Sequence, residues 1–534
     1  MKRIDPRDAK ALLHNGGEIG FVDVREHGQF GEGHPLFAVP LPYSELELRI
    51  GAMAPRRDVP LLLIDAGDGV AERAAARLAE MGYSDVAVIS GGVPGWAAAG
   101  LPVYKGVNVP SKLLGELAET LWHPRMVRAE ELAEMTRAGS DIAFFDTRPP
   151  QEYAKMRVPG AVNLPNGELP HRLAALPDDR PIVVTCAGRT RGIVGAIGLA
   201  LVGAGERVQA LENGTQGWAL AGFDLERDNI AAPLPALDEA ALAASRARAD
   251  ALIARYGFAR VDADAVARMR DDPARSTYVL DLRSDAETAA DPVAAARPAP
   301  GVQLVQATDQ WIAVRRSRVV LCCDTGLRSA IAAFWLVQLG FEPVIARIDD
   351  SLRALPAPEV PQPRRAAPVD TVSAAQALRL LREGARLIDL RPSRHYAAGH
   401  LAGAIWSIRP RIGALAPRIG ERVALLVAAR PEIARLAARD LHEAGVKRIA
   451  VVDGGQAALE RAGAAVEPNP SEPAAKDAID FLRFVHDRHD GNLDASRRYL
   501  AWETGLIAQL DAQERAEYRL IGPEDDAPRA APGG

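Results

Sequence analysis

The run Ile182-Val183-Val184-Thr185-Cys186-Ala187-Gly188-Arg189-Thr190-Arg191-Gly192 joins an apolar segment to a short polar loop, and an alanine-containing apolar stretch follows it. A short run of branched apolar residues predicts a buried strand, and the longer stretch after the loop predicts a helix. The chain therefore passes from strand to loop to helix here, with a cysteine at the start of the loop.

A second loop of this kind is Cys322-Cys323-Asp324-Thr325-Gly326-Leu327-Arg328-Ser329, after the apolar run 319–322. We assign both loops to one pattern, Cys-x-x-Gly-x-Arg. A loop that enters a helix directs its backbone N–H groups into one concavity, at the positive end of the helix dipole. This setting favours the thiolate, the nucleophilic form of cysteine. Arg191 and Arg328 would close the ring and offer a planar fork to an oxyanion.

The surrounding sequence repeats four times. Apolar runs end in Asp-x-Arg at 21–25, 144–148, 279–283 and 387–391, and a second apolar run follows each at 61–64, 182–185, 319–322 and 424–427. Strands that alternate with helices indicate a mainly parallel sheet covered on both faces. The repeats predict an α/β protein of four small tandem domains at 1–104, 125–226, 257–355 and 369–467. We expect the four Asp-x-Arg pairs to be structural.

The connecting segments differ in composition. A helix is predicted from Asp238 to Arg255, and the proline-rich stretch 356–368 is typical of a stiff spacer. The segment 474–521 has helical spacing and predicts a helical tail, and the residues from 523 onward are predicted to be disordered.

The other two repeats lack a nucleophile in the loop. Asp65 stands at the cysteine position of the first repeat and Ala428 at that of the fourth. The array is therefore expected to be inactive, active, active and inactive, with Cys186 ranked before Cys323. Asp324 beside Cys323 should raise the pKa of that thiol and repel anionic donors. We interpret Cys322 as a buried strand residue.

Composition narrows the class of protein. The chain has 534 residues, a net charge of -6 and only three cysteines. The net charge leaves no excess of basic residues that could bind a nucleic-acid backbone. Three cysteines are too few for a disulfide framework, and this low number is typical of a protein from the reducing cytosol. No stretch predicts a signal peptide or a membrane span, so we expect a cytoplasmic protein. Histidine and cysteine show no metal-ligand spacing, so neither a metal nor a cofactor is predicted.

The motifs together resemble those of the rhodanese family, sulfurtransferases that carry sulfur as a cysteine persulfide. The resemblance rests on the Asp-x-Arg strand ends, the cysteine loops, the glycine turn at 91–96, and Glu152-Tyr153 followed by 159–165. It covers about 400 residues, as four modules, and it excludes the tail. By analogy with two-module rhodaneses, modules one and two would pair, and so would three and four.

The resemblance implies a ping-pong transfer of sulfur from thiosulfate, or a similar donor, to cyanide or a thiol acceptor. Cys186 would be the nucleophile and Cys323 a second one. The remaining candidate site residues bind the substrate; they are Ala187, Gly188, Arg189, Thr190, Arg191, Gly326 and Arg328. A persulfide relay or sensing scaffold with a protein partner is the alternative function. Phosphatase-like hydrolysis is disfavoured, because related phosphatases use a loop longer by one residue.

Overall fold

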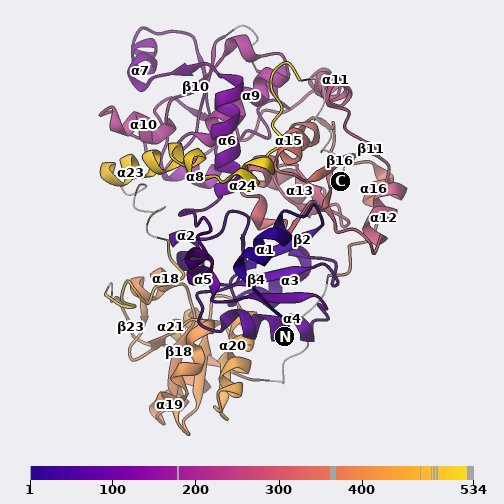
Figure 1. Cartoon of the computed structure of the whole chain (residues 1–534). Helices are drawn as coiled ribbons and strands as arrows, with labels where there is room; N and C mark the ends of the chain where they lie inside the picture. The colour runs from indigo at the N-terminus through magenta and orange to yellow at the C-terminus, as the bar shows by residue number, and fades with distance from the viewer. Residues whose placement is uncertain are drawn as a thin grey trace.

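The computed structural model describes residues 2–176, 180–360, 369–469, 471–482, 484, 488 and 491–525. Four small sheets follow one another along the chain, and helices surround each of them (Figure 1). This α/β architecture confirms the predicted fold class. Part of the proline-rich spacer (361–368) and the end of the chain (526–534) lie outside the described residues, so those predictions stay untested.

Module 1 shows why each sheet is covered on both faces. Its strand order is β1-β5-β4-β2, with β3 beside β2, and all of these strands are parallel. Successive residues of β2 enter different cores: Phe21 packs in one apolar cluster and Val22 in another. The strands are β1 (Lys2–Ile4), β2 (Ile19–Asp23), β3 (Val39–Pro40), β4 (Leu61–Ile64) and β5 (Val86–Ile89). The helices are α1 (Pro6–Leu13), α2 (His27–Glu32), α3 (Leu46–Met53), α4 (Val70–Glu80) and α5 (Gly92–Ala98).

Module 2 has the strand order β6-β10-β9-β7-β8. Its strands are β6 (Met126–Val127), β7 (Ala143–Asp146), β8 (Val162–Asn163), β9 (Ile182–Thr185) and β10 (Val208–Leu211). Its helices are α7 (Ala129–Arg137), α8 (Pro150–Lys155), α9 (Thr190–Leu201) and α10 (Gly214–Leu220), with short 3-10 turns η1 (Leu173–Ala175) and η2 (Gly205–Arg207).

Module 3 repeats this order as β11-β16-β15-β12-β13. Its strands are β11 (Arg260–Val261), β12 (Thr277–Asp281), β13 (Arg297–Pro298), β15 (Arg318–Cys323) and β16 (Glu342–Arg347). Its helices are α12 (Ala263–Asp271), α13 (Asp285–Ala290), α14 (Gly301–Gln306), α15 (Leu327–Gln338) and α16 (Asp350–Arg353), with η3 (Thr308–Gln310). A further strand of this stretch, β14 (Val314–Arg315), leaves the module and pairs antiparallel with β2 of module 1.

Module 4 has the order β17-β22-β21-β18-β20. Its strands are β17 (Asp370–Val372), β18 (Arg386–Asp389), β20 (Ile405–Trp406), β21 (Ala424–Val427) and β22 (Ile449–Val452), and β19 (His400–Leu401) pairs separately with β23 (Val466–Glu467). Its helices are α17 (Ala374–Arg382), α18 (Ser393–Ala398), α19 (Ala416–Ile419), α20 (Pro431–Glu443) and α21 (Gly455–Arg461), with η4 (Arg409–Leu415).

Two connector helices and the tail complete the chain. Helix α6 (Val109–Trp122) joins modules 1 and 2, and α11 (Glu239–Tyr256) joins modules 2 and 3. Helix α11 matches the predicted segment closely: the Asp238 side chain caps its start by accepting from the N–H of Ala241. The tail contains α23 (Leu493–Thr504), η6 (Ile507–Gln509) and α24 (Ala512–Ala516), and it crosses beside α6 (Figure 1). No described helix is long and apolar enough to cross a membrane.

The modules pair differently from the analogy with two-module rhodaneses. Module 1 packs on module 4, where the guanidinium of Arg409 bonds Glu47 at 2.6 Å. Module 2 packs on module 3, where Arg328 bonds Glu168 at 2.7 Å. The predicted pairing of one with two, and of three with four, is therefore wrong. The two modules that carry loop cysteines face each other, and the two that lack them form the other pair.

Candidate active site

Cys186 directly follows β9, and four residues later α9 begins. Its sulfur accepts the N–H of Gly192 at 3.3 Å, and the side chain is 2% exposed. Burial raises the pKa of this thiol, although Arg191 and the N–H groups of Gly188 and Gly192 act to lower it. The loop groups thus act in the expected direction, but the expected thiolate is wrong for the resting site, because removal from water outweighs their effect.

Arg191 lies on the first turn of α9 and forms a double hydrogen bond with Glu152 of α8, each bond 2.7 Å long. Burial opposes ionisation of Glu152, but the Arg191 guanidinium lowers the pKa of that carboxyl to about 2. The pair is thus fully charged at neutral pH. Arg191 therefore lies beside Cys186 and is paired with a single carboxylate, which comes from its own module.

The other predicted loop residues bond to neighbouring elements. Arg189 binds Glu116 of α6 through two hydrogen bonds of 2.8 and 3.0 Å, so its guanidinium is already engaged. The Thr190 hydroxyl donates to Glu503 of the tail helix α23, and the Ala187 carbonyl accepts from Gln216 of α10. The loop is therefore fixed from three sides.

The pattern Cys-x-x-Gly-x-Arg, which the sequence analysis assigned to both loops, is wrong for this loop, because its glycine stands one position earlier. Gly188 is the second residue after Cys186, and Arg189 occupies the third place, where Gly326 stands in module 3. Gly326 adopts the left-handed region with φ 87°, whereas Arg189 has φ -114°. Gly188 lies close to another element instead: a Cβ there would lie 3.1 Å from a Glu503 oxygen. The tail packs on the loop at this point.

Cys323 is the last residue of β15 and is fully buried. Its sulfur accepts the N–H of Gly326 and the hydroxyl of Ser329, both at 3.2 Å. Burial raises the pKa of this thiol; Arg328 lowers it and Asp324 raises it further, as the sequence predicted for Asp324. Cys322, in contrast, points into an apolar core, in agreement with its interpretation as a strand residue.

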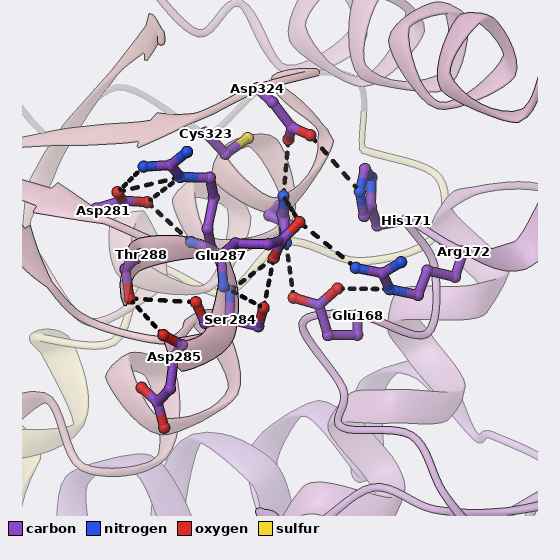
Figure 2. A network of polar contacts seen from close by, with 12 residues as sticks. Glu168, His171, Arg172, Asp281, Ser284, Asp285, Glu287, Thr288, Cys323 and Asp324 are labelled. Carbon is purple, nitrogen blue, oxygen red and sulfur yellow. Dashed lines mark hydrogen bonds and ion pairs between the residues drawn. The ribbon is translucent and has the colours of Figure 1, made fainter. Parts of the chain in front are cut away.

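Arg328 differs from Arg191 in its surroundings, and Figure 2 shows the carboxylates Glu168, Glu287 and Asp324 gathered beside Cys323. It bonds Glu287 of its own module and Glu168 of module 2, each at 2.7 Å, and Asp324 at 2.8 Å. Three carboxylates thus surround one guanidinium, and its side chain has no exposure to solvent.

The loops without cysteine occupy matching positions. The strand registers pair Asp23 with Ile64, Asp146 with Thr185, Asp281 with Cys322 and Asp389 with Val427, which aligns Asp65, Cys186, Cys323 and Ala428. Asp65 accepts three loop N–H groups, from Gly67 at 2.8 Å, Gly69 at 3.1 Å and Ala71 at 2.9 Å. In module 1 a carboxylate of the chain itself therefore occupies the ring of N–H groups.

The Asp-x-Arg pairs have the same geometry in all four modules. Each arginine binds its aspartate through Nε and Nη2 and donates to a carbonyl eight residues further on: Gly33, Met156, Asp291 and Gly399. Since the modules without cysteine keep this arrangement, the pairs hold the loop after the strand, as predicted.

Comparison with known proteins places these sites in a family. The rhodanese-like domain profile matches residues 5–99 and 128–221. The crystal structure of a thiosulfate sulfurtransferase from Pseudomonas aeruginosa superimposes with a TM-score of 0.90 at 35% identity, over 98% of this chain and 100% of the other. The chain belongs to the rhodanese family. It is a rhodanese-type transferase.

Partial matches are found among curated proteins. A thiosulfate sulfurtransferase of Pseudomonas aeruginosa is 27% identical over 186 residues, which are 30% of this rhodanese and 67% of that protein. An HTH-type transcriptional regulator of Mycobacterium tuberculosis is 35% identical over 111 residues, 20% of this chain. The match spans about half of that regulator, 48% of its length.

Sequence reasoning missed the acidic partners of the loop arginines in this rhodanese. Glu152 and Glu287 each stand six residues after the aspartate of Asp-x-Arg, whereas Gln29 and His395 stand there in the modules without cysteine. That coincidence of glutamate with cysteine is a signal the sequence contains. Glu168 and Glu503 had no such signal, because they reach the loops from another module and from the tail.

One cluster could hold a cation. His171, Glu287 and Asp324 place one ligand atom each within 4.8 Å of one another. The Arg328 guanidinium already bonds both carboxylates, so a positive charge occupies this place. The rhodanese thus supplies its own cation here, and the predicted absence of a metal stays a prediction.

Proposed function

We propose that this rhodanese transfers the outer sulfur of thiosulfate, or of a similar anionic donor, to a thiophilic acceptor through a persulfide on Cys186. The sulfurtransferases among its relatives support the reaction class. The observation that carries the proposal is the contact of the Cys186 sulfur with the N–H of Gly192, beside Arg191. This contact supports a nucleophile in a ring of donors that suits one extra anionic sulfur.

The reaction proceeds in two balanced steps. After the thiol proton leaves to solvent, the Cys186 thiolate bonds to the outer sulfur of thiosulfate. The sulfur–sulfur bond of the donor breaks, and sulfite departs with the electron pair. Cyanide or a thiolate then takes the outer sulfur from the persulfide, which releases thiocyanate or a new persulfide and restores the Cys186 thiolate.

The loop residues have separate tasks in this proposal. The N–H groups of Gly188 and Gly192 stabilise the persulfide anion, and Arg191 attracts the sulfonate of the donor. Ala187, Arg189 and Thr190 hold the shape of the ring through Gln216, Glu116 and Glu503. Gly326 and Arg328 would act in the same way for Cys323.

Replacement of each cysteine tests the assignment. In Cys186→Ser, thiosulfate:cyanide transfer should fall to background, and the mass gain of about 32 Da on the peptide that contains residue 186 should disappear. Cys323→Ser should keep most of the activity, and the double variant should match Cys186→Ser. Loss of activity in Cys323→Ser alone would contradict the assignment.

A protein persulfide donor is the alternative. The 2% exposure of Cys186 favours a small donor. If a persulfidated protein loaded Cys186 faster than an equal concentration of thiosulfate, the relay function would replace the proposed one.

A further inference from the structure

The two cysteine modules meet across one interface, yet their arginines have different partners. Arg191 and Arg328 both border a single cavity between α9 and α15. Among the described residues, Arg191 bonds only the carboxylate of Glu152, from its own module. Arg328 bonds Glu287 in the equivalent place and also Asp324 and, from across the interface, Glu168.

Part of this difference arises at one position that is equivalent in the two modules and holds a different residue in each. Strand pairing aligns Asp146 with Asn163 in module 2 and Asp281 with Pro298 in module 3, with equal spacing. Five residues after these partners stand Glu168 and Gln303. Module 2 therefore presents a carboxylate to Arg328, whereas the equivalent position of module 3 carries a neutral amide, whose oxygen is buried without a hydrogen-bond partner among the described residues.

Glu168 is held in place before any substrate arrives. One of its oxygens accepts from Arg328 at 2.7 Å, and the other accepts from Arg172 at 2.9 Å (Figure 2). Its side chain is 6% exposed. Beside it, the hydroxyl of Ser245 on α11 donates to Thr325 of the Cys323 loop at 2.9 Å. Module 2 and the connector helix thus close over this loop together.

We propose that Glu168 is a specificity-determining residue, which closes the Cys323 site to anionic sulfur donors so that thiosulfate loads Cys186 and not Cys323. A sulfonate can approach Arg328 only against three carboxylates, and Nη1 and Nη2 of the buried guanidinium already donate to them. At Arg191 the same sulfonate meets one carboxylate. This inference rests on the proposed persulfide chemistry of Cys186.

The test measures sulfur loading of each cysteine by mass spectrometry after thiosulfate treatment. In the Cys186→Ser background, Cys323 should load about tenfold or more slowly than Cys186 does in the natural chain. Adding Glu168→Gln should raise the loading of Cys323 by about tenfold or more. Adding Asp324→Ala as well should raise it further, because Arg328 then faces one carboxylate, as Arg191 does. Glu239→Gln, which removes an exposed charge at the start of α11, is the control and should change nothing.

The opposite substitution at the equivalent position of module 3 provides an independent test. Gln303→Glu places a carboxylate at the matching position of module 3 and should slow the loading of Cys186 by about tenfold. Rapid loading of Cys323 in Cys186→Ser alone would overturn the inference, as would unchanged rates in both Glu168→Gln and Gln303→Glu. If Glu168→Gln does not fold, the effect of Gln303→Glu decides. Failure of Cys186 to load in the natural chain would instead refute the proposed function itself.

Discussion

At the scale of single residues, two opposing effects act on the pKa of the Cys186 thiol. Burial raises its pKa, whereas Arg191 and two loop N–H groups lower it, and burial prevails. A buried thiol with a raised pKa is mostly protonated at neutral pH and stays protected from alkylation and oxidation. The same N–H groups become useful once the sulfur carries charge.

The reactivity of Cys186 should therefore increase with pH through a midpoint above the ordinary value of 9.0. A raised pKa leaves less thiolate at each pH below it, so alkylation at neutral pH should be slower than for a free thiol. Iodoacetamide labelling of Cys186 across pH, in a Cys323→Ser background, measures this. Arg191→Ala should move the midpoint higher, because it removes the cation that lowers the pKa. A midpoint below that of a free thiol would contradict the prediction.

The sequence predicts the two candidate nucleophiles, but it predicts the surroundings of the two sites only in part. Cysteine, arginine and the preceding apolar run lie within ten residues of one another, so local spacing locates the loop. Glu168 meets Arg328 across 160 positions, and no periodicity encodes such a contact. The contacts of Glu503 with Gly188 and Thr190 also depend on a tail whose docking place the sequence does not specify. The burial that raises the pKa of Cys186 is a property of the folded chain, so local spacing does not predict the direction of that shift.

At the scale of elements, the strand–loop–helix unit persists after its chemistry is lost. In module 1 the ring of N–H groups binds the carboxylate of Asp65. In module 4 the same position holds Ala428, and Pro431 begins the helix, where a missing N–H costs nothing. The two modules thus satisfy one backbone geometry in different ways.

Asp65→Ala should destabilise module 1 by about 1–3 kcal/mol, because it leaves three loop N–H groups, that of the buried Ala71 among them, without this acceptor. The midpoint of thermal unfolding measures the loss. Asp65→Asn keeps one acceptor oxygen and should cost less. Sulfur loading of Cys186 should be unchanged in both variants, and an Asp65→Ala chain as stable as the natural one would show that water satisfies the loop instead.

At the scale of the whole molecule, interfaces between modules combine apolar contacts with buried ion pairs. Arg409 bonds Glu47 across the interface of modules 1 and 4, while Arg77 reaches back to Asp440 at 2.9 Å. The tail adds contacts to several modules: Glu517 binds His14 of module 1 and Arg315 of β14. Stability of one module therefore depends on its neighbours.

Arg409→Ala should lower the free energy of unfolding by about 3–5 kcal/mol, because Glu47 would remain buried without this partner. Thermal unfolding and limited proteolysis of module 4 report the change. The control is Arg128→Ala, which breaks an exposed pair with Glu131 and should have no measurable effect. Equal effects of the two substitutions would show that the buried pair is dispensable.

Glu517 should make stability depend on acid. Burial opposes its ionisation, but His14, Arg315 and Arg316 lower its pKa from 4.5 to about 2. A depressed folded-state pKa stabilises the protein above pH 4.5, and this contribution is lost as the pH falls towards 2. Glu517→Gln should thus cost about 3 kcal/mol at neutral pH and progressively less below pH 4.5. Thermal midpoints of both chains across pH test this, and a constant difference would contradict it.

The tail that packs on Gly188 also sets an order in time. A ribosome makes Cys186 long before Glu503, so the contacts of Glu503 with the Cys186 loop, at Gly188 and Thr190, form only late in synthesis. Until then, module 2 and α6 alone shape this loop. The loop therefore reaches its final surroundings only after residue 503 has left the ribosome.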